Sequence, residues 1–231
     1  MSLTRYGLRE WLTITLLSAA LGAIAAWYGW WWLVALVALI WLSGVAFFRD
    51  PWRRVPADLP RGAMLSPADG VVSRILRVDR HAATGGPAIV VRIFLSVLDV
   101  HVNRAPCDGE VVSVAHAPGR YLDARSEESA QVNESNLVTL RLAERDGASG
   151  GETIGVRQVA GAIARRIVCP IRPGQRLRGG ERFGMIKFGS TTELVLPRPD
   201  DVDVRVAEGQ RVRGGVTLLA VLRPRGGDAP R

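Results

Sequence analysis

Lysine, histidine and cysteine are scarce in this chain of 231 residues. Lys187 is the single lysine among 30 basic residues, and there are three histidines and two cysteines. Amine chemistry on carbonyl compounds generally uses a lysine Schiff base with pyridoxal phosphate, or a carbonyl built into the protein. The first route is poorly supported, because no Gly-rich phosphate cradle opens a helix in this sequence. Cys107 and Cys169 lack the spacing of metal ligands, so we predict no metal site and interpret them as buried thiols.

Charged residues are absent from Trp11 to Phe48. One straight helix of that length would be about 57 Å long, which exceeds a hydrocarbon core of about 30 Å. Tyr28-Gly29 interrupts the run within a tryptophan cluster, so we expect a transmembrane helical hairpin over residues 1–48. The alternative is a cleaved signal peptide with a processing site at Ala23-Ile-Ala25, but the apolar run is much longer than the ~7–15 residues of such peptides.

Arginines flank both ends of the apolar run, and the net charge of the chain is +8. The positive-inside bias then puts both ends of the hairpin, and the domain that follows, on the cytoplasmic side of the cell membrane. A basic surface on an anchored protein attracts anionic membrane lipids. Nucleic acid is not a predicted partner, because the arginines are scattered and the soluble part has few aromatic residues to stack on bases.

Beyond the apolar run, short aliphatic segments are separated by Gly, Pro and Asp, a pattern that indicates strands. The segments are Val71–Ile75, Ala88–Leu95, Glu110–Val114, Leu137–Leu140, Leu194–Leu196, Val202–Val206 and Thr217–Leu222. We assign residues 49–222 to one domain. The polar segment Tyr121–Asn136 is expected to be a loop near the functional site, and residues 223–231 a disordered tail.

Two pairs of similar segments indicate an internal duplication. Pro67-Ala-Asp-Gly-Val-Val-Ser73 resembles Pro106-Cys-Asp-Gly-Glu-Val-Val-Ser113, and Gly174-Gln-Arg-Leu-Arg-Gly-Gly180 resembles Gly209-Gln-Arg-Val-Arg-Gly-Gly215. An Asp-Gly turn before a Val-rich strand is ordinary hairpin chemistry. The paired copies predict a mostly β fold, a pseudo-symmetric β-sandwich or flattened barrel like the lipoyl and biotinyl domains.

The bond between Gly189 and Ser190 is suited to an N→O acyl transfer. Ser190 Oγ can attack the carbonyl of Gly189, since glycine has no Cβ to block the approach and tolerates a strained backbone. Elimination from the resulting ester leaves dehydroalanine, and loss of ammonia then leaves a pyruvoyl ketone at residue 190. A Gly-Ser-Thr triplet alone is more often a polar turn after a strand, so its surroundings must decide.

His101 is the strongest candidate among the three histidines for acid–base chemistry. If the strand that ends near Phe94 continues, Asp99 and His101 share one face. A carboxylate beside an imidazole raises its basicity and can fix its tautomer. Asp69, in Ser66-Pro-Ala-Asp-Gly70, is by itself a turn residue.

Several motifs together resemble the phosphatidylserine decarboxylases, in particular the short type with a Phe-Gly-Ser cleavage motif. They are Phe47-Phe-Arg-Asp-Pro51, Ser66-Pro-Ala-Asp-Gly70, Phe94-Leu-Ser96, Asp99-Val-His-Val-Asn-Arg-Ala-Pro106, Asn133-Glu134, Ala164-Arg-Arg-Ile-Val168 and Gly180-Glu-Arg-Phe-Gly-Met-Ile-Lys-Phe-Gly-Ser190. They occur in the order found in that family, from about Phe47 to Leu196.

The resemblance implies a membrane-associated proenzyme that cuts itself between Gly189 and Ser190. The products would be a β chain of residues 1–189 and an α chain of residues 190–231, which stay together as a heterodimer and can form a higher oligomer. Ser190 would become the pyruvoyl cofactor, which forms a Schiff base with phosphatidylserine and releases carbon dioxide and phosphatidylethanolamine. His101 and Asp69 would assist, with His101 as the acid that protonates the α-carbon.

One position departs from the family pattern. Some members have a histidine where this chain has Arg104, and that histidine acts with the aspartate in self-cleavage. The processing base is therefore open, with His101, Asp99 and Asp69 as candidates. The alternative function is a non-enzymatic, membrane-anchored lipoyl-like domain that serves as an adaptor or carrier.

Overall fold

A computed structural model describes residues 2–143, 151–162, 166–187 and 190–224 of the chain. The chain divides into two compact units, Met1–Trp52 and Arg53–Arg231. Gly189 and residues 225–231 of the predicted tail lie outside the described residues.

The first unit is a pair of packed helices, α1 (Leu8–Trp27) and α2 (Trp31–Phe47). The 3-10 helix η1 (Arg5–Gly7) precedes α1, and the short strands β1 (Ser2–Leu3) and β2 (Arg49–Asp50) pair with each other. Gly29 has a φ of 71° in the turn between the helices, a conformation that glycine adopts without strain.

The helices touch along their length, and Trp41 Nε1 donates a hydrogen bond to Thr15 Oγ1 at 3.1 Å. Ala25 is the single buried residue of α1, so most of its apolar surface faces outward. Arg5–Trp27 is long and apolar enough to cross a membrane, whereas Trp31–Phe47 is shorter. The helical hairpin with its break at Tyr28-Gly29 is as predicted, and its insertion into a membrane remains a prediction.

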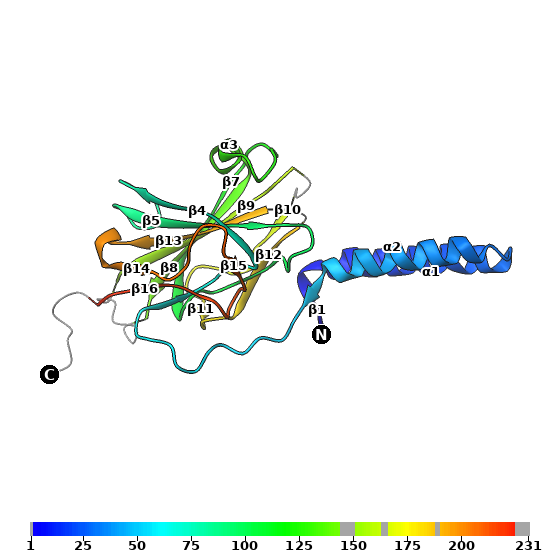
Figure 1. Cartoon of the computed structure of the whole chain (residues 1–231), viewed down its shortest axis with the longest axis horizontal. Coiled ribbons are helices and arrows are strands. Elements are labelled where there is room, and N and C mark those ends of the chain that lie inside the picture. Colours follow the sequence, from blue (N-terminus) through cyan, green and yellow to red (C-terminus); the bar gives the residue numbers. More distant parts are fainter. Residues whose placement is uncertain (1, 144–150, 163–165, 188–189, 225–231) are drawn as a thin grey trace. The chain divides into compact units, whose positions relative to one another are not determined.

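The second unit is mostly β, as predicted, and Figure 1 shows its strands. Its described residues form one eight-stranded sheet and two three-stranded sheets, with antiparallel pairing between neighbours. The large sheet has the spatial order β11 (Arg176–Leu177), β7 (Gly109–Ala117), β8 (Ser135–Leu142), β9 (Thr153–Val159), β13 (Ser190–Pro197), β5 (Ala88–Leu95), β4 (Gly70–Val78) and β15 (Arg211–Val212). The smaller sheets are β10 (Arg166–Val168), β12 (Arg182–Lys187), β6 (Val102–Arg104) and β14 (Val202–Val204), β16 (Leu218–Leu222), β3 (Ala63–Leu65).

The internal duplication seen in the sequence has a structural counterpart. The two Asp-Gly segments lead into β4 and β7, and the two Gly-Gln-Arg segments lead into β15 and β11, which pair with them. The registers match, since Val212 faces Gly70 and Leu177 faces Gly109. The β-unit therefore consists of two halves with the same strand pairing. One half is made of β6 to β12, and the other is made of β3 to β5 together with β13 to β16. The finer likeness to lipoyl domains remains a prediction.

The core of the second unit is a hydrophobic cluster that takes residues from all three sheets. Ile93 comes from the large sheet, Phe183 from β12 and Leu219 from β16, and each is fully buried. Such burial contributes about 1.5–3 kcal/mol for each large apolar side chain. The sheets are thereby fixed to one another around the site.

The polar segment Tyr121–Asn136 contains a short helix that the sequence did not predict, α3 (Glu127–Val132). Ser126 caps it, because its Oγ accepts a hydrogen bond from Ser129 N at 3.2 Å. A second short helix, η3 (Pro199–Asp201), lies between β13 and β14. The expected loop thus contains a helix that the sequence does not indicate, because six residues are too few to show a helical period.

Candidate active site

Ser190 is the first residue of β13, where it pairs with Leu95 at the end of β5. Its side chain is fully buried. Among the described residues, its Oγ is the single buried side-chain polar atom without a hydrogen-bond partner. A buried hydroxyl without a partner costs about 1–3 kcal/mol, so its presence points to a chemical role.

A chain of buried amides holds the start of β13. Thr192 lies on the same face of the strand as Ser190, and its Oγ1 accepts from Asn103 Nδ2 at 3.0 Å. Gln158 Nε2 donates to Asn103 Oδ1 at 2.8 Å, and Asn136 Nδ2 donates to Gln158 Oε1 at 3.0 Å. This network ties the first residues of β13 to β6, β9 and β8. Asn103 falls in a motif of the sequence, and Asn136 ends the polar segment expected near the site, but nothing in the sequence singled out Gln158.

The opposite face of β13 carries a buried carboxylate between two arginines. Glu193 Oε1 accepts from Arg92 Nε at 2.8 Å, and its Oε2 lies 3.3 Å from Arg157 Nη1. The Glu193 side chain is 4% exposed. Because Arg92 is on β5 and Arg157 on β9, the cluster joins β13 to both neighbouring strands.

His101 lies just outside a strand and not within one. β5 ends at Leu95 and β6 begins at Val102, so a turn separates them. His101 is fully buried, and its carbonyl oxygen accepts from Ile186 N at 3.2 Å, four residues before Ser190. The expectation that Asp99 and His101 share a face of a continuing strand is wrong, because the strand ends four residues before Asp99.

The His101 imidazole contacts the main chain of Asp99, with Nδ1 2.9 Å from the Asp99 carbonyl oxygen. A carbonyl oxygen only accepts hydrogen bonds, so Nδ1 carries the hydrogen in this contact. In the neutral ring the basic nitrogen is therefore Nε2. The tautomer is set by a backbone carbonyl, where the sequence had suggested a carboxylate.

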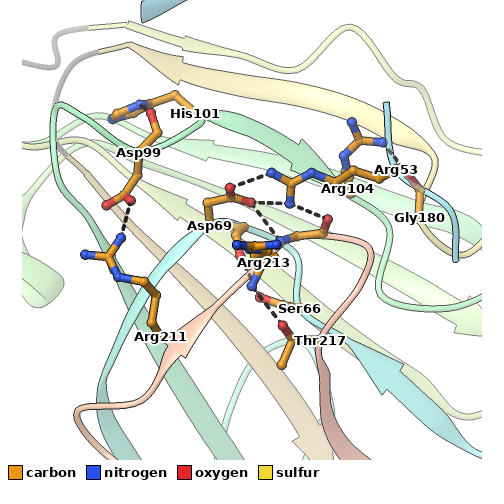
Figure 2. Close-up of polar contacts among 12 residues, drawn as sticks. Arg53, Ser66, Asp69, Asp99, His101, Arg104, Gly180, Arg211, Arg213 and Thr217 are labelled. Carbon is orange, nitrogen blue, oxygen red and sulfur yellow. Dashed lines mark hydrogen bonds and ion pairs between the residues drawn. The ribbon is translucent and has the colours of Figure 1, made fainter. Parts of the chain in front are cut away.

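The Asp99 carboxylate has other partners. Its Oδ1 accepts from Arg211 Nη1 at 3.0 Å, the contact drawn in Figure 2. Its Oδ2 accepts from Ser96 N at 2.9 Å and from Ser96 Oγ at 2.7 Å. These contacts close the turn between β5 and β6. Asp99 thus stabilises the turn that carries His101.

Asp69 is held by an arginine clamp (Figure 2). Arg53 Nη1 and Nη2 donate to its two carboxylate oxygens, each at 2.5 Å, and Gly214 N donates to Oδ1 at 2.8 Å. Arg104, at the position where some relatives have a histidine, donates through Nη1 to the carbonyl of Gly180 at 3.1 Å. In this chain the charged partner of Asp69 is therefore Arg53.

The remaining titratable candidates have other partners. His116 Nε2 pairs with Glu134 at 3.1 Å, and His81 Nδ1 accepts from Ala83 N at 3.1 Å. Burial raises the pKa of the Cys169 thiol to about 11. Among the described residues, no group of three His, Cys, Asp or Glu side chains is arranged to hold a metal ion.

Ser190 and His101 flank the two connections between the halves of the domain. The chain passes from the half that contains β5 to the half made of β6 to β12 through the β5–β6 turn, which ends at His101. It comes back at β13, which begins at Ser190. The Leu95–Ser190 pair and the Ile186–His101 hydrogen bond bring these two connections together. These features define a β-domain that carries a buried serine, whose Oγ has no hydrogen-bond partner among the described residues, and a buried histidine of defined tautomer.

Residues 44–220 match the phosphatidylserine decarboxylase family. The chain is 42% identical to a phosphatidylserine decarboxylase proenzyme of Rhodopirellula baltica, over 94% of this chain and 86% of that protein. The chain is also 42% identical to a phosphatidylserine decarboxylase proenzyme of Carboxydothermus hydrogenoformans, over 83% of this chain and 85% of that protein. It is 45% identical to one of Cereibacter sphaeroides, over 76% of this chain and 73% of that protein. The chain belongs to the phosphatidylserine decarboxylase family. These matches favour an enzyme over an adaptor or carrier.

Proposed function

We propose that this protein is a self-processing, pyruvoyl-dependent decarboxylase that converts phosphatidylserine to phosphatidylethanolamine and carbon dioxide. The observation that carries the proposal is the buried, unpartnered Oγ of Ser190 at the start of β13. Family membership supports the same activity, since the curated relatives are named phosphatidylserine decarboxylase proenzymes.

Self-cleavage follows from the position of Ser190. Its Oγ attacks the carbonyl carbon of Gly189, the peptide C–N bond breaks as the Ser190 nitrogen takes up a proton and becomes an amine, and an ester joins the two residues. Elimination, in which the Ser190 α-carbon loses its proton and the Gly189 carboxylate leaves, then cuts the chain. Hydrolysis of the resulting dehydroalanine releases ammonia and leaves the pyruvoyl ketone. The hydroxyl gives up no hydrogen bond in the attack, because it has none in the described structure. His101 Nε2 is the base that takes the hydroxyl proton, since Nδ1 is engaged with the Asp99 carbonyl.

The two aspartates support this step through the backbone. The Asp99 carboxylate closes the turn before His101, and Asp69 joins the turn before β4 to Arg53 and to the Gly214 backbone. Each carboxylate is already engaged by an arginine. We therefore assign the proton transfer to His101 and a positioning role to Asp69 and Asp99.

The residues around Ser190 fit a pyruvoyl group. Conversion of the serine removes a side-chain hydroxyl that has no partner among the described residues, so no side-chain hydrogen bond of Ser190 is lost. The group, when formed, supplies an electrophilic ketone that binds an amine and withdraws electrons as the carboxylate leaves. His101 then supplies the proton to the α-carbon of the decarboxylated lipid. The amide network through Asn103 and Thr192 keeps the start of β13 in place.

Substrate and location follow from the lipid nature of the reaction. The helices α1 and α2 would anchor the protein in the cell membrane, with the β-domain on the cytoplasmic side. The flanking arginines and the net charge of +8 support this orientation and the attraction to anionic lipids. After cleavage the working unit is a heterodimer of residues 1–189 and 190–231.

Intact-mass analysis of the purified protein tests the proposal. We expect two pieces, residues 1–189 and 190–231, the smaller with a ketone at its N-terminus that reacts with hydroxylamine. Ser190→Ala should abolish both cleavage and decarboxylation. Thr191→Ala is the matched control, because its side chain lies on the other face of β13 and donates to the Ala124 carbonyl at 3.3 Å. A wild-type chain that stays whole and lacks ketone reactivity would refute the proposal.

A further inference from the structure

The turn between β5 and β6 has a polar base and an apolar tip. At the base, Asp99 N donates to the Ser96 carbonyl at 2.9 Å, and Ser96 N and Oγ both donate to the Asp99 carboxylate. Four residues are thereby held in a closed turn, with Val97 and Leu98 at its tip. These contacts give the tip a fixed shape before any partner arrives.

The tip exposes more apolar surface than any other described part of the β-unit. Leu98 is 82% exposed and Val97 45%, whereas the other exposed large apolar residues of Arg53–Arg231 lie between 36% and 41%. Single exposed apolar residues are common and need no explanation. Two adjacent ones on a hydrogen-bonded turn are unusual, because turns favour small and polar residues.

The tip lies beside the candidate active site. Leu95, the residue just before the turn, pairs with Ser190. His101, the second residue after the turn, carries the proposed base. A contact made by Leu98 therefore forms at the edge of the proposed lipid-processing centre.

One exposed arginine lies at the base of the turn, and a second belongs to a segment that reaches the same end of β13. Arg211 binds Asp99 at the base of the turn, and its side chain is 71% exposed. The segment that includes Tyr121 and Arg125 reaches the same end of β13, because Thr191 Oγ1 donates to the Ala124 carbonyl. The Arg125 side chain, which is ion-paired with Asp123, is 75% exposed, and Tyr121 is 37% exposed. An apolar tip with aromatic and cationic neighbours suits the interface of an anionic bilayer, where hydrocarbon lies just beneath negative head groups.

We propose that Val97 and Leu98 form a membrane-contact tip that enters the surface of an anionic bilayer and holds the active site against it. The contact is separate from α1 and α2, and it rests on the proposed lipid decarboxylase function. The tip inserts its apolar side chains, while the exposed arginines face phosphate and carboxylate groups of the lipids. Through this contact the enzyme can reach a head group without removing the lipid from the bilayer.

Depth of insertion tests the proposal without reference to activity. The full chain carrying Leu98→Cys is labelled with an environment-sensitive fluorophore and reconstituted into vesicles of phosphatidylcholine and phosphatidylglycerol. The native thiols label poorly, since Cys107 is buried and the pKa of Cys169 is raised to about 11. Leu76→Cys, on an exposed edge position of β4 that is 36% exposed, is the matched control. We expect lipid-borne spin labels to quench the fluorophore at position 98 at least threefold more than at position 76.

Equal quenching at both positions would overturn the proposal. A second outcome would also overturn the proposal. If the label at position 98 is shielded in detergent without lipid, to a degree that depends on protein concentration, the tip contacts a second copy of the chain. A kinetic experiment uses aspartate at the same two positions, Leu98→Asp and Leu76→Asp. It measures the ratio of activity on vesicles to activity on dispersed short-chain phosphatidylserine. We expect this ratio to fall roughly fivefold or more for Leu98→Asp and to stay within twofold for Leu76→Asp.

A fall of both activities in proportion would mean that Leu98 acts on the site itself, and the tip would be rejected. Failure of the wild-type protein to decarboxylate either substrate would reject the proposed function instead. The quenching result is read independently in that case, so the two failures are distinguishable.

Discussion

The clamp between Arg53 and Asp69 should be a major source of stability in the β-unit. The Arg53 guanidinium makes two contacts of 2.5 Å with the carboxylate and a third, of 2.8 Å, with the Gly214 carbonyl. The two side chains are only 9% and 14% exposed. Arg53→Gln leaves a nearly buried carboxylate with Gly214 N as its remaining donor. Loss of one partner of such a pair costs about 3–5 kcal/mol.

For a domain of this size, each kcal/mol lowers the melting temperature by about 2–4 °C, so Arg53→Gln should lower it by roughly 6–20 °C. Calorimetry should use a Ser190→Ala background, so that every sample is uncut. The double variant Arg53→Gln with Asp69→Asn should recover part of the loss, because it leaves no buried charge.

The control is Arg77→Gln, which breaks an ion pair whose side chains are 60% and 82% exposed. Such a pair contributes at most about 1 kcal/mol, so we expect a shift of no more than about 4 °C. If Arg53→Gln shifts the melting temperature no more than Arg77→Gln does, the clamp is not a stabilising contact. If the double variant is as unstable as the sum of the single ones, the two residues are not coupled, and the positioning role of Asp69 fails with them.

Three further predictions concern single side chains. His101→Gln should slow self-cleavage by roughly 100-fold or more, the usual scale for loss of a general base; a normal cleavage time course in protein with a wild-type melting temperature would contradict that role. Burial lowers the pKa of His81 below its ordinary 6.5, and Ala83 N donates to its Nδ1, so the fold favours the neutral ring. Stability should therefore fall as the pH drops below about 6.5, and melts of His81→Asn should show a flatter pH profile. With a pKa of about 11, against an ordinary value of 9.0, Cys169 should react with iodoacetamide at pH 8 roughly 100-fold more slowly than a free thiol; mass spectrometry of the alkylated peptides would detect rapid labelling if burial does not suppress the thiolate.

The elements that the sequence predicted are those that local patterns specify. Ala88–Leu95 is β5 with the predicted bounds, and the break at Tyr28-Gly29 separates α1 from α2. The paired Asp-Gly and Gly-Gln-Arg segments predicted pseudo-symmetry, because each copy makes the same turn and the same strand pair. The strand β9 (Thr153–Val159) was missed, since its sequence mixes glycine and charged residues with aliphatic ones.

The sequence indicated which residues are candidates for the site, but it did not indicate which residues they contact. His101 and Ser190 belong to motifs, whereas the partners that define their environment come from distant positions. Glu193 meets Arg92 and Arg157, which are 101 and 36 residues away along the chain. Asp69 meets Arg53, a residue that the sequence marked only as a flanking charge of the apolar run. No local pattern specifies such pairs, because they depend on strand order in the folded sheet.

Strand order also explains how the protein would stay in one piece after the proposed cleavage. The new N-terminus at Ser190 begins β13, which pairs with β5 through eight residues and with β9 through five. Farther along, β14, β15 and β16 pair with each other or with β4 and β3. The short chain would thus supply a central strand and an edge strand of the large sheet and two strands of a smaller one. Its release would expose Leu194 and Leu196, both fully buried, so the proposed cut would free the end at residue 190 while β13 stays in the sheet, with Ser190 paired to Leu95 at the end of β5.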